Sequence, residues 1–111
     1  MNRRDRSRVT FGTFSRPADK TESADAEIYL NGEHVGWIEK DVAVVEEGLR
    51  TCEDRLAVCS YTVILFDRDE QETFDLHYNR HGELKPSSMT WRQALAAAKD
   101  YARRELLGGD R

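Results

Sequence analysis

Alternating apolar and polar side chains predict a β-hairpin in the first third of the chain. Two alternating runs flank Asn31-Gly32, a dipeptide typical of type I′ turns because both turn positions need positive φ. With a two-residue turn, Ile28 opposes Val35. The register then predicts that Ile28, Val35 and Trp37 share one face of the sheet.

Three further segments carry strand patterns. Residues 56–66 form the longest apolar run and are rich in β-branched and aromatic side chains, which predicts a central strand with two largely apolar faces. Residues 72–78 alternate again, and residues 8–15 suggest a short first strand. Residues 39–55 fit either a strand followed by a loop or a short helix.

A helix is predicted over residues 90–107. Thr90 and Gln93 have the spacing of a capping box, and Gly108-Gly109 provides a stop signal. Apolar residues that recur every three or four positions mark the expected buried stripe. They are Trp91, Leu95, Ala98, Ala102 and Leu106.

Together these elements predict an α+β fold, in which an antiparallel sheet of about four to five strands has one C-terminal helix packed on one face. Residues 1–8 are expected to be a disordered basic arm, and residues 9–111 a single α+β domain. One helix covers one face only. The N-terminal segment, residues 42–55 or a second copy of the chain could cover the other, and we expect a homodimer.

Composition supports one small domain outside the membrane. The chain has 111 residues, of which 39% are hydrophobic and 34% charged, a size that forms a core without metals or disulfides. Its apolar runs are too short to span a bilayer, and its N-terminus lacks a signal-peptide pattern. We therefore expect a cytoplasmic protein with no membrane partner.

Charge is strongly segregated along the chain. The net charge is −4 overall, but residues 1–20 carry +4, residues 21–75 carry −11 and residues 76–111 carry +3. Segregated charge produces a directional field that influences partner choice and association rate. The charge pattern therefore bears on what the protein binds rather than on its fold.

Motifs for catalysis or ligand binding are weak. His77 and His81 have ligand-like spacing without a third ligand, and Asp67-x-Asp69 lacks the glycine and distal glutamate of a calcium loop. Cys52 and Cys59 do not form a Cys-x-x-Cys pair. We predict no catalytic, cofactor-binding or metal-binding residues, no cofactor and no enzymatic activity.

The acidic segment suggests the main functional hypothesis. We predict a non-enzymatic protein-interaction module whose acidic surface binds a basic protein. In its most specific form, this hypothesis predicts an inhibitor or regulator of a nucleic-acid-binding protein. Such a protein would be a nucleic-acid mimic like those that phages direct against bacterial immunity complexes. The predicted partner-binding residues are Glu33, Glu39, Asp41, Glu46, Glu47, Glu53, Asp54, Asp67, Asp69, Glu70 and Glu72.

The alternative hypothesis uses the basic ends of the chain. In it, the N-terminal arm and the C-terminal helix contact phosphates, and the protein is a small nucleic-acid-associated regulator. The overall acidity, with a pI near 5.4, makes direct nucleic-acid binding the less favoured of the two. The basic side chains involved are Arg3, Arg4, Arg6, Arg8, Arg16, Arg92, Lys99, Arg103 and Arg104.

Overall fold

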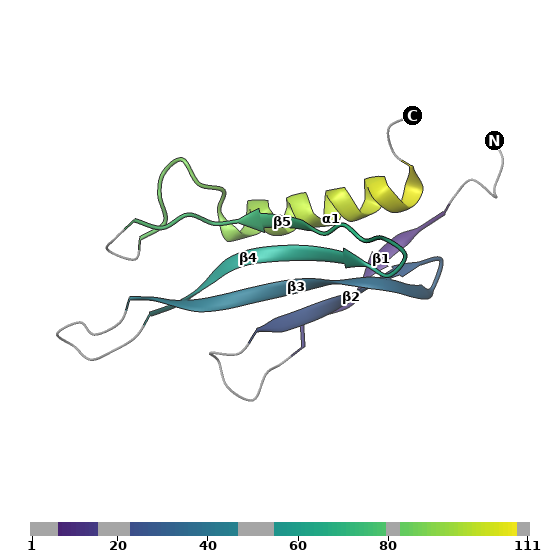
Figure 1. The fold of residues 1–111 in the computed structure, drawn as a ribbon, viewed down its shortest axis with the longest axis horizontal. Helices are drawn as coiled ribbons and strands as arrows, with labels where there is room; N and C mark the ends of the chain where they lie inside the picture. Colours follow the sequence, from purple (N-terminus) through teal and green to yellow (C-terminus); the bar gives the residue numbers. More distant parts are fainter. Residues whose placement is uncertain (1–6, 16–22, 47–54, 80–82, 109–111) are drawn as a thin grey trace.

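The fold is a five-stranded antiparallel sheet with one helix packed against it (Figure 1). The computed structural model describes residues 7–15, 23–46, 55–79 and 83–108. The strands follow one another across the sheet in chain order, so every connection is a simple antiparallel return. The predicted α+β fold is confirmed. The elements are β1 (Val9–Phe11), β2 (Ala24–Leu30), β3 (Glu33–Glu46), β4 (Arg55–Leu65), β5 (Glu72–Asp75) and α1 (Trp91–Leu107).

The turn between β2 and β3 has the predicted geometry. Asn31 has φ 53° and Gly32 has φ 85°, the positive values that a type I′ turn requires. Residues 39–46, for which the sequence predicts either a strand or a short helix, continue β3. β3 and β4 therefore form a long hairpin, and residues 47–54 lie outside the described part of the chain.

The predicted register of this hairpin is wrong beyond its first two pairs. Tyr29 opposes His34, but the next pair is Ile28 with Gly36, so Val35 is an extra residue in β3. This bulge moves Trp37 to the face opposite Ile28. Gly36 is required at the new position, because a Cβ there would lie 2.1 Å from the carbonyl oxygen of Ile64.

The helix begins as predicted but buries a slightly different stripe. The capping box is present: Gln93 N–H donates to Thr90 Oγ1 at 3.1 Å, and Thr90 N–H donates to Gln93 Oε1 at 2.9 Å. Ala94, Ala98 and Ala102 are completely buried. Their small side chains bring the helix close to the sheet, and the repeat of four keeps them on one face.

Trp91 is the exception to the predicted stripe. It remains 49% exposed, so its assignment to the buried face is wrong. Trp91 is the first helical residue, one turn before the alanine contact with the sheet begins. Its ring instead lies 5.1 Å from the Arg92 guanidinium, within the range of a cation–π contact.

The two faces of the sheet have different surroundings. On one face Ile28, Ile38, Tyr61, Val63 and Leu65 pack with the helix alanines in a single buried cluster. All five strands belong to one sheet, and the described helix packs on this face. None of the strands and helices that the structure describes therefore covers the opposite face. The homodimer proposed to cover it stays a prediction.

Candidate functional site: the open face of the sheet

The face opposite the helix, called the open face below, presents an ordered array of side chains from four strands. Residues that oppose one another in neighbouring strands share a face. Asp25, Glu39, Thr62 and Thr73 therefore form one row across the sheet. A second row contains Glu27, Trp37 and Ile64, and a third contains Asp41, Ser60 and Asp75.

Five carboxylates are collected on the open face. Asp25 and Glu39 are direct cross-strand partners, an arrangement of like charges that weakens a sheet. The three rows contain no lysine or arginine. Lys40 belongs to the other face, where its Nζ lies 5.2 Å from the Phe14 ring centre. The carboxylates are Asp25, Glu27, Glu39, Asp41 and Asp75.

Hydroxyl groups fix part of this array. Ser60 Oγ donates to Asp41 Oδ2 at 3.1 Å, and Ser23 Oγ donates to Asp41 Oδ1 at 3.4 Å. The hydroxyls of Thr62 and Thr73 lie 3.0 Å apart across β4 and β5. Ser60 and Thr62 are buried although no described helix or strand covers them. The centre of the open face is therefore ordered before any partner binds.

Aromatic side chains gather at the end of the open face nearest the β2–β3 turn. The ring centres of Tyr29 and His34 are 5.5 Å apart, those of His34 and Phe66 are 5.0 Å apart, and those of Trp37 and Phe66 are 5.3 Å apart. Phe66 is 53% exposed. The open face thus runs from an aromatic end to an acidic end, and the bulge at Val35 is what places Trp37 there.

One hydrogen bond connects the aromatic and acidic ends. The Tyr29 hydroxyl donates to a carboxylate oxygen of Glu27. This bond stabilises the protonated phenol and raises the pKa of Tyr29, with smaller contributions from burial and from the negative charge of Glu27.

The predicted acidic residues are distributed over several parts of the molecule. Glu39 and Asp41 lie on the open face, whereas Glu33 and Asp67 line a pocket at the aromatic end. Asp69 and Glu70 are exposed in the connection before β5, and Glu72 begins β5. Glu46 ends β3, and Glu47, Glu53 and Asp54 lie outside the described residues.

Sequence reasoning missed three carboxylates of the open face. Asp25 and Glu27 alternate with the buried residues of β2, and Asp75 alternates with Phe74 and Leu76. The period of two was visible in the sequence and could have identified all three. Trp37 could not be found this way, because the bulge reverses its face.

The histidine, cysteine and aspartate motifs can be compared with the positions of their residues. Among the described residues, no group of three or more His, Cys, Asp or Glu side chains is placed to hold a metal ion. His77 is exposed and Cys59 is half-buried, while His81 and Cys52 lie outside the described residues. No helix in the described ranges is long and apolar enough to cross a membrane.

Comparisons with protein-family models, curated proteins and solved structures find no match. A function is therefore inferred from the geometry and charge of the open face.

Proposed function

We propose that this protein is a non-enzymatic interaction module that binds a basic protein through the open face. The observation that carries the proposal is the array of five carboxylates, with no lysine or arginine in its rows, beside an exposed aromatic group. Clustered charge of one sign attracts an oppositely charged partner and accelerates encounter. The aromatic end supplies the apolar contact that charge alone lacks.

The spacing of the carboxylates supports mimicry of a nucleic acid. Same-face positions along a strand are about 6.7 Å apart. Five charges in three such rows give roughly one charge per 4 Å of strand axis, and one nucleic-acid strand carries one per ~3.4 Å. A partner that normally binds phosphates would meet a similar charge density. The proposed role is inhibition or regulation of a nucleic-acid-binding protein.

A charge-neutralised variant tests this proposal. We expect the intact protein to bind a fluorescein-labelled oligo-arginine peptide, with affinity that falls as salt is added because the charges are solvent-exposed. The triple variant Asp25→Asn, Glu39→Gln, Asp75→Asn should lose at least tenfold in affinity. Fluorescence anisotropy measures both. Asp41 is left unchanged because it accepts bonds from Ser23 and Ser60.

A second triple variant is the matched control. Asp69→Asn, Glu70→Gln, Glu72→Gln changes the net charge by the same amount but lies off the open face. This variant should lose much less affinity than the first. Equal losses would show that total charge, and not the open face, determines binding, and the proposal would be rejected.

A second candidate function is favoured by one observation on the other side of the molecule. Lys99 Nζ and Arg103 Cζ lie 5.3 and 5.2 Å from the ring centre of Phe11. The segment that follows the basic arm thus contacts the helix cations, as nucleic-acid binding by both would require. Deletion of residues 1–8 should then abolish binding of labelled DNA or RNA at low salt. An intact protein that binds neither would remove this candidate.

A further inference from the structure

A pocket of about 260 Å³ adjoins the aromatic end of the open face. Small-molecule sites typically measure about 300–1,000 Å³, so this pocket suits a single side chain better than a free ligand. Its apolar walls are Leu30, Val35, Phe66 and Leu106, and its polar residues are Glu33, His34 and Asp67.

Three parts of the fold meet at this pocket. A backbone hydrogen bond connects the turn after β4 to β3: the Phe66 N–H donates to the Val35 carbonyl oxygen at 2.9 Å. This bond brings Asp67 beside the start of β3, where Glu33 lies. Leu106, in the last turn of α1, closes the pocket on the helix side. Two carboxylates that are distant in sequence therefore share one apolar pocket.

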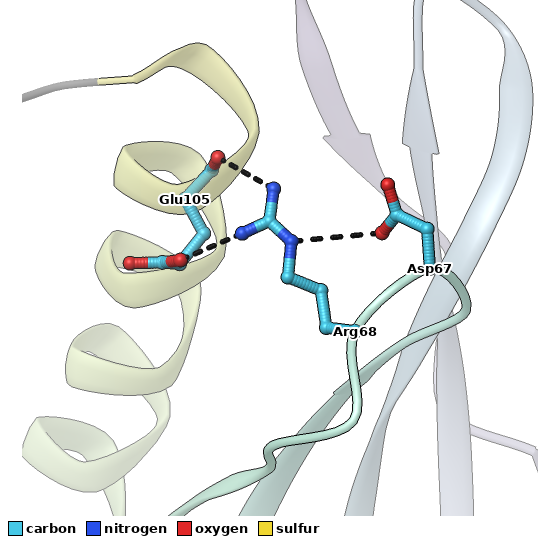
Figure 2. A network of polar contacts seen from close by, with 3 residues as sticks. All are labelled: Asp67, Arg68 and Glu105. Atoms are coloured by element: carbon cyan, nitrogen blue, oxygen red, sulfur yellow. Dashed lines mark hydrogen bonds and ion pairs between the residues drawn. The ribbon is translucent and has the colours of Figure 1, made fainter.

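The neighbouring cation does not neutralise the pocket. Arg68 Nη1 lies 2.7 Å from Glu105 Oε1, and Arg68 Nη2 donates to the Glu105 carbonyl oxygen at 3.1 Å. Its Nε is 3.6 Å from Asp67 Oδ1, and Figure 2 shows that this contact reaches only one of the two Asp67 carboxylate oxygens. The Asp67 side chain remains 79% exposed. Arg68 is therefore paired mainly with the helix, and Asp67 remains accessible.

We infer that this pocket receives an arginine side chain of the basic partner. The inference rests on the proposed function and specifies which residue of the partner anchors it. The aliphatic part of arginine matches Leu30, Val35 and Leu106. The guanidinium can stack on the exposed Phe66 ring and donate hydrogen bonds to the carboxylates of Glu33 and Asp67.

Arginine suits this combination better than the alternatives. A lysine ammonium is a strongly hydrated point charge without a planar surface to stack on Phe66. An apolar side chain would reduce the access of Glu33 and Asp67 to water without offering either carboxylate a hydrogen-bond donor. Phe66 contacts both His34 and Trp37, so an occupant of the pocket would be continuous with a chain lying on the open face.

Amide chemical shifts of the full-length protein, titrated with N-acetyl-arginine methylamide, test the inference. We expect saturable shifts concentrated at Glu33, Val35, Phe66, Asp67 and Leu106. The citrulline derivative has nearly the same shape without the charge, and it should bind at least tenfold more weakly. The lysine and norleucine derivatives should also bind more weakly than arginine.

Single substitutions then locate the site. Glu33→Gln and Asp67→Asn should each weaken binding of the arginine derivative several-fold, whereas Asp100→Asn, on the helix and outside the pocket, should leave its affinity unchanged. Equal binding of arginine and citrulline, stronger binding of lysine or norleucine, shifts outside the pocket, or no saturable shift would each overturn the inference.

The two proposals fail separately. If the arginine derivative enters the pocket but the open-face triple variant keeps full affinity for oligo-arginine, the pocket stands and the proposed function fails. If the triple variant loses affinity while the arginine derivative produces no saturable shift, the open face binds cations without this anchor.

Discussion

The two faces of this sheet are built from the same strands, yet they are specialised in opposite ways. In β4, Tyr61, Val63 and Leu65 enter the core, while the intervening Ser60, Thr62 and Ile64 belong to the open face. The covered face is apolar and closes against small alanines. The open face carries charged and aromatic side chains that no described element covers, as the proposed binding role requires.

The same substitution on each face gives the largest expected contrast. Ile38→Ala removes a completely buried side chain and should lower the free energy of unfolding by about 2–5 kcal/mol. Ile64→Ala should lower it by about 1 kcal/mol, because Ile64 already contacts solvent and leaves no closed cavity. Urea unfolding of both variants measures the difference.

Equal losses for the two isoleucine variants would contradict the comparison. Such a result would mean that the open face is covered in solution, by another part of this chain or by a second copy. Repeating the unfolding at several protein concentrations separates these explanations, since only a second copy makes stability depend on concentration.

Removing charge from the open face should have a smaller effect of opposite sign. Asp25→Asn combined with Glu39→Gln relieves a direct repulsion between cross-strand partners and should raise stability by about 0.2–1 kcal/mol at low salt. The gain should shrink as salt is added. Asp100→Asn is the control on the helix, where the carboxylate pairs with Arg103 at 3.1 Å, and it should not stabilise the protein. No gain at low salt would indicate that these two carboxylates do not repel each other.

The smallest contrast concerns tyrosine ionisation. The pKa of Tyr61 is raised chiefly by burial, whereas that of Tyr29 is raised chiefly by its hydrogen bond to Glu27. Glu27→Gln should therefore lower the pKa of Tyr29 toward its usual value and leave Tyr61 unchanged. Ultraviolet titration of phenolate formation, with Tyr29→Phe and Tyr61→Phe for assignment, measures this.

The same shifts fix the sign of the stability change at high pH. A raised folded-state pKa means that the unfolded chain releases the tyrosine proton first, near pH 10. The contribution of Tyr61 is present below that pH and is lost as pH rises through its folded-state pKa. Unfolding measured across this range should show a weaker loss in Tyr61→Phe. An identical loss would exclude Tyr61 as its source.

Local signals made much of the fold predictable. The Asn31-Gly32 turn and the Thr90–Gln93 capping box depend on a few adjacent residues, and both are confirmed. The face of Trp37 depends on the fit of Gly36 against a backbone carbonyl in β4, which is a contact between distant segments. A pattern read along one strand cannot reveal that contact.

The candidate site also contains one part that the sequence could predict and one part that it could not. Asp25 and Glu27 follow a simple alternation and were within reach of the sequence. The meeting of Glu33 and Asp67 requires the backbone bond that joins Phe66 to Val35, and no spacing in the sequence indicates it. Charge segregation located the acidic part of the chain but could not show which carboxylates lie together.

The bulge at Val35 determines which side chains of β3 face the core and which face the open side of the sheet. If Val35 were paired as in a regular hairpin, Trp37, Glu39 and Asp41 would turn to the helix side and Ile38 to the solvent, since side chains alternate strictly along a strand. Removing Val35 would instead leave Gly36 opposite Ile28 and Trp37 opposite Glu27, so every face would be kept. Surface connections normally tolerate small changes in length. A single deletion within β3 beyond Gly36 would, by contrast, exchange inside and outside along the rest of the strand, so the core and the proposed binding surface depend on the same residue count.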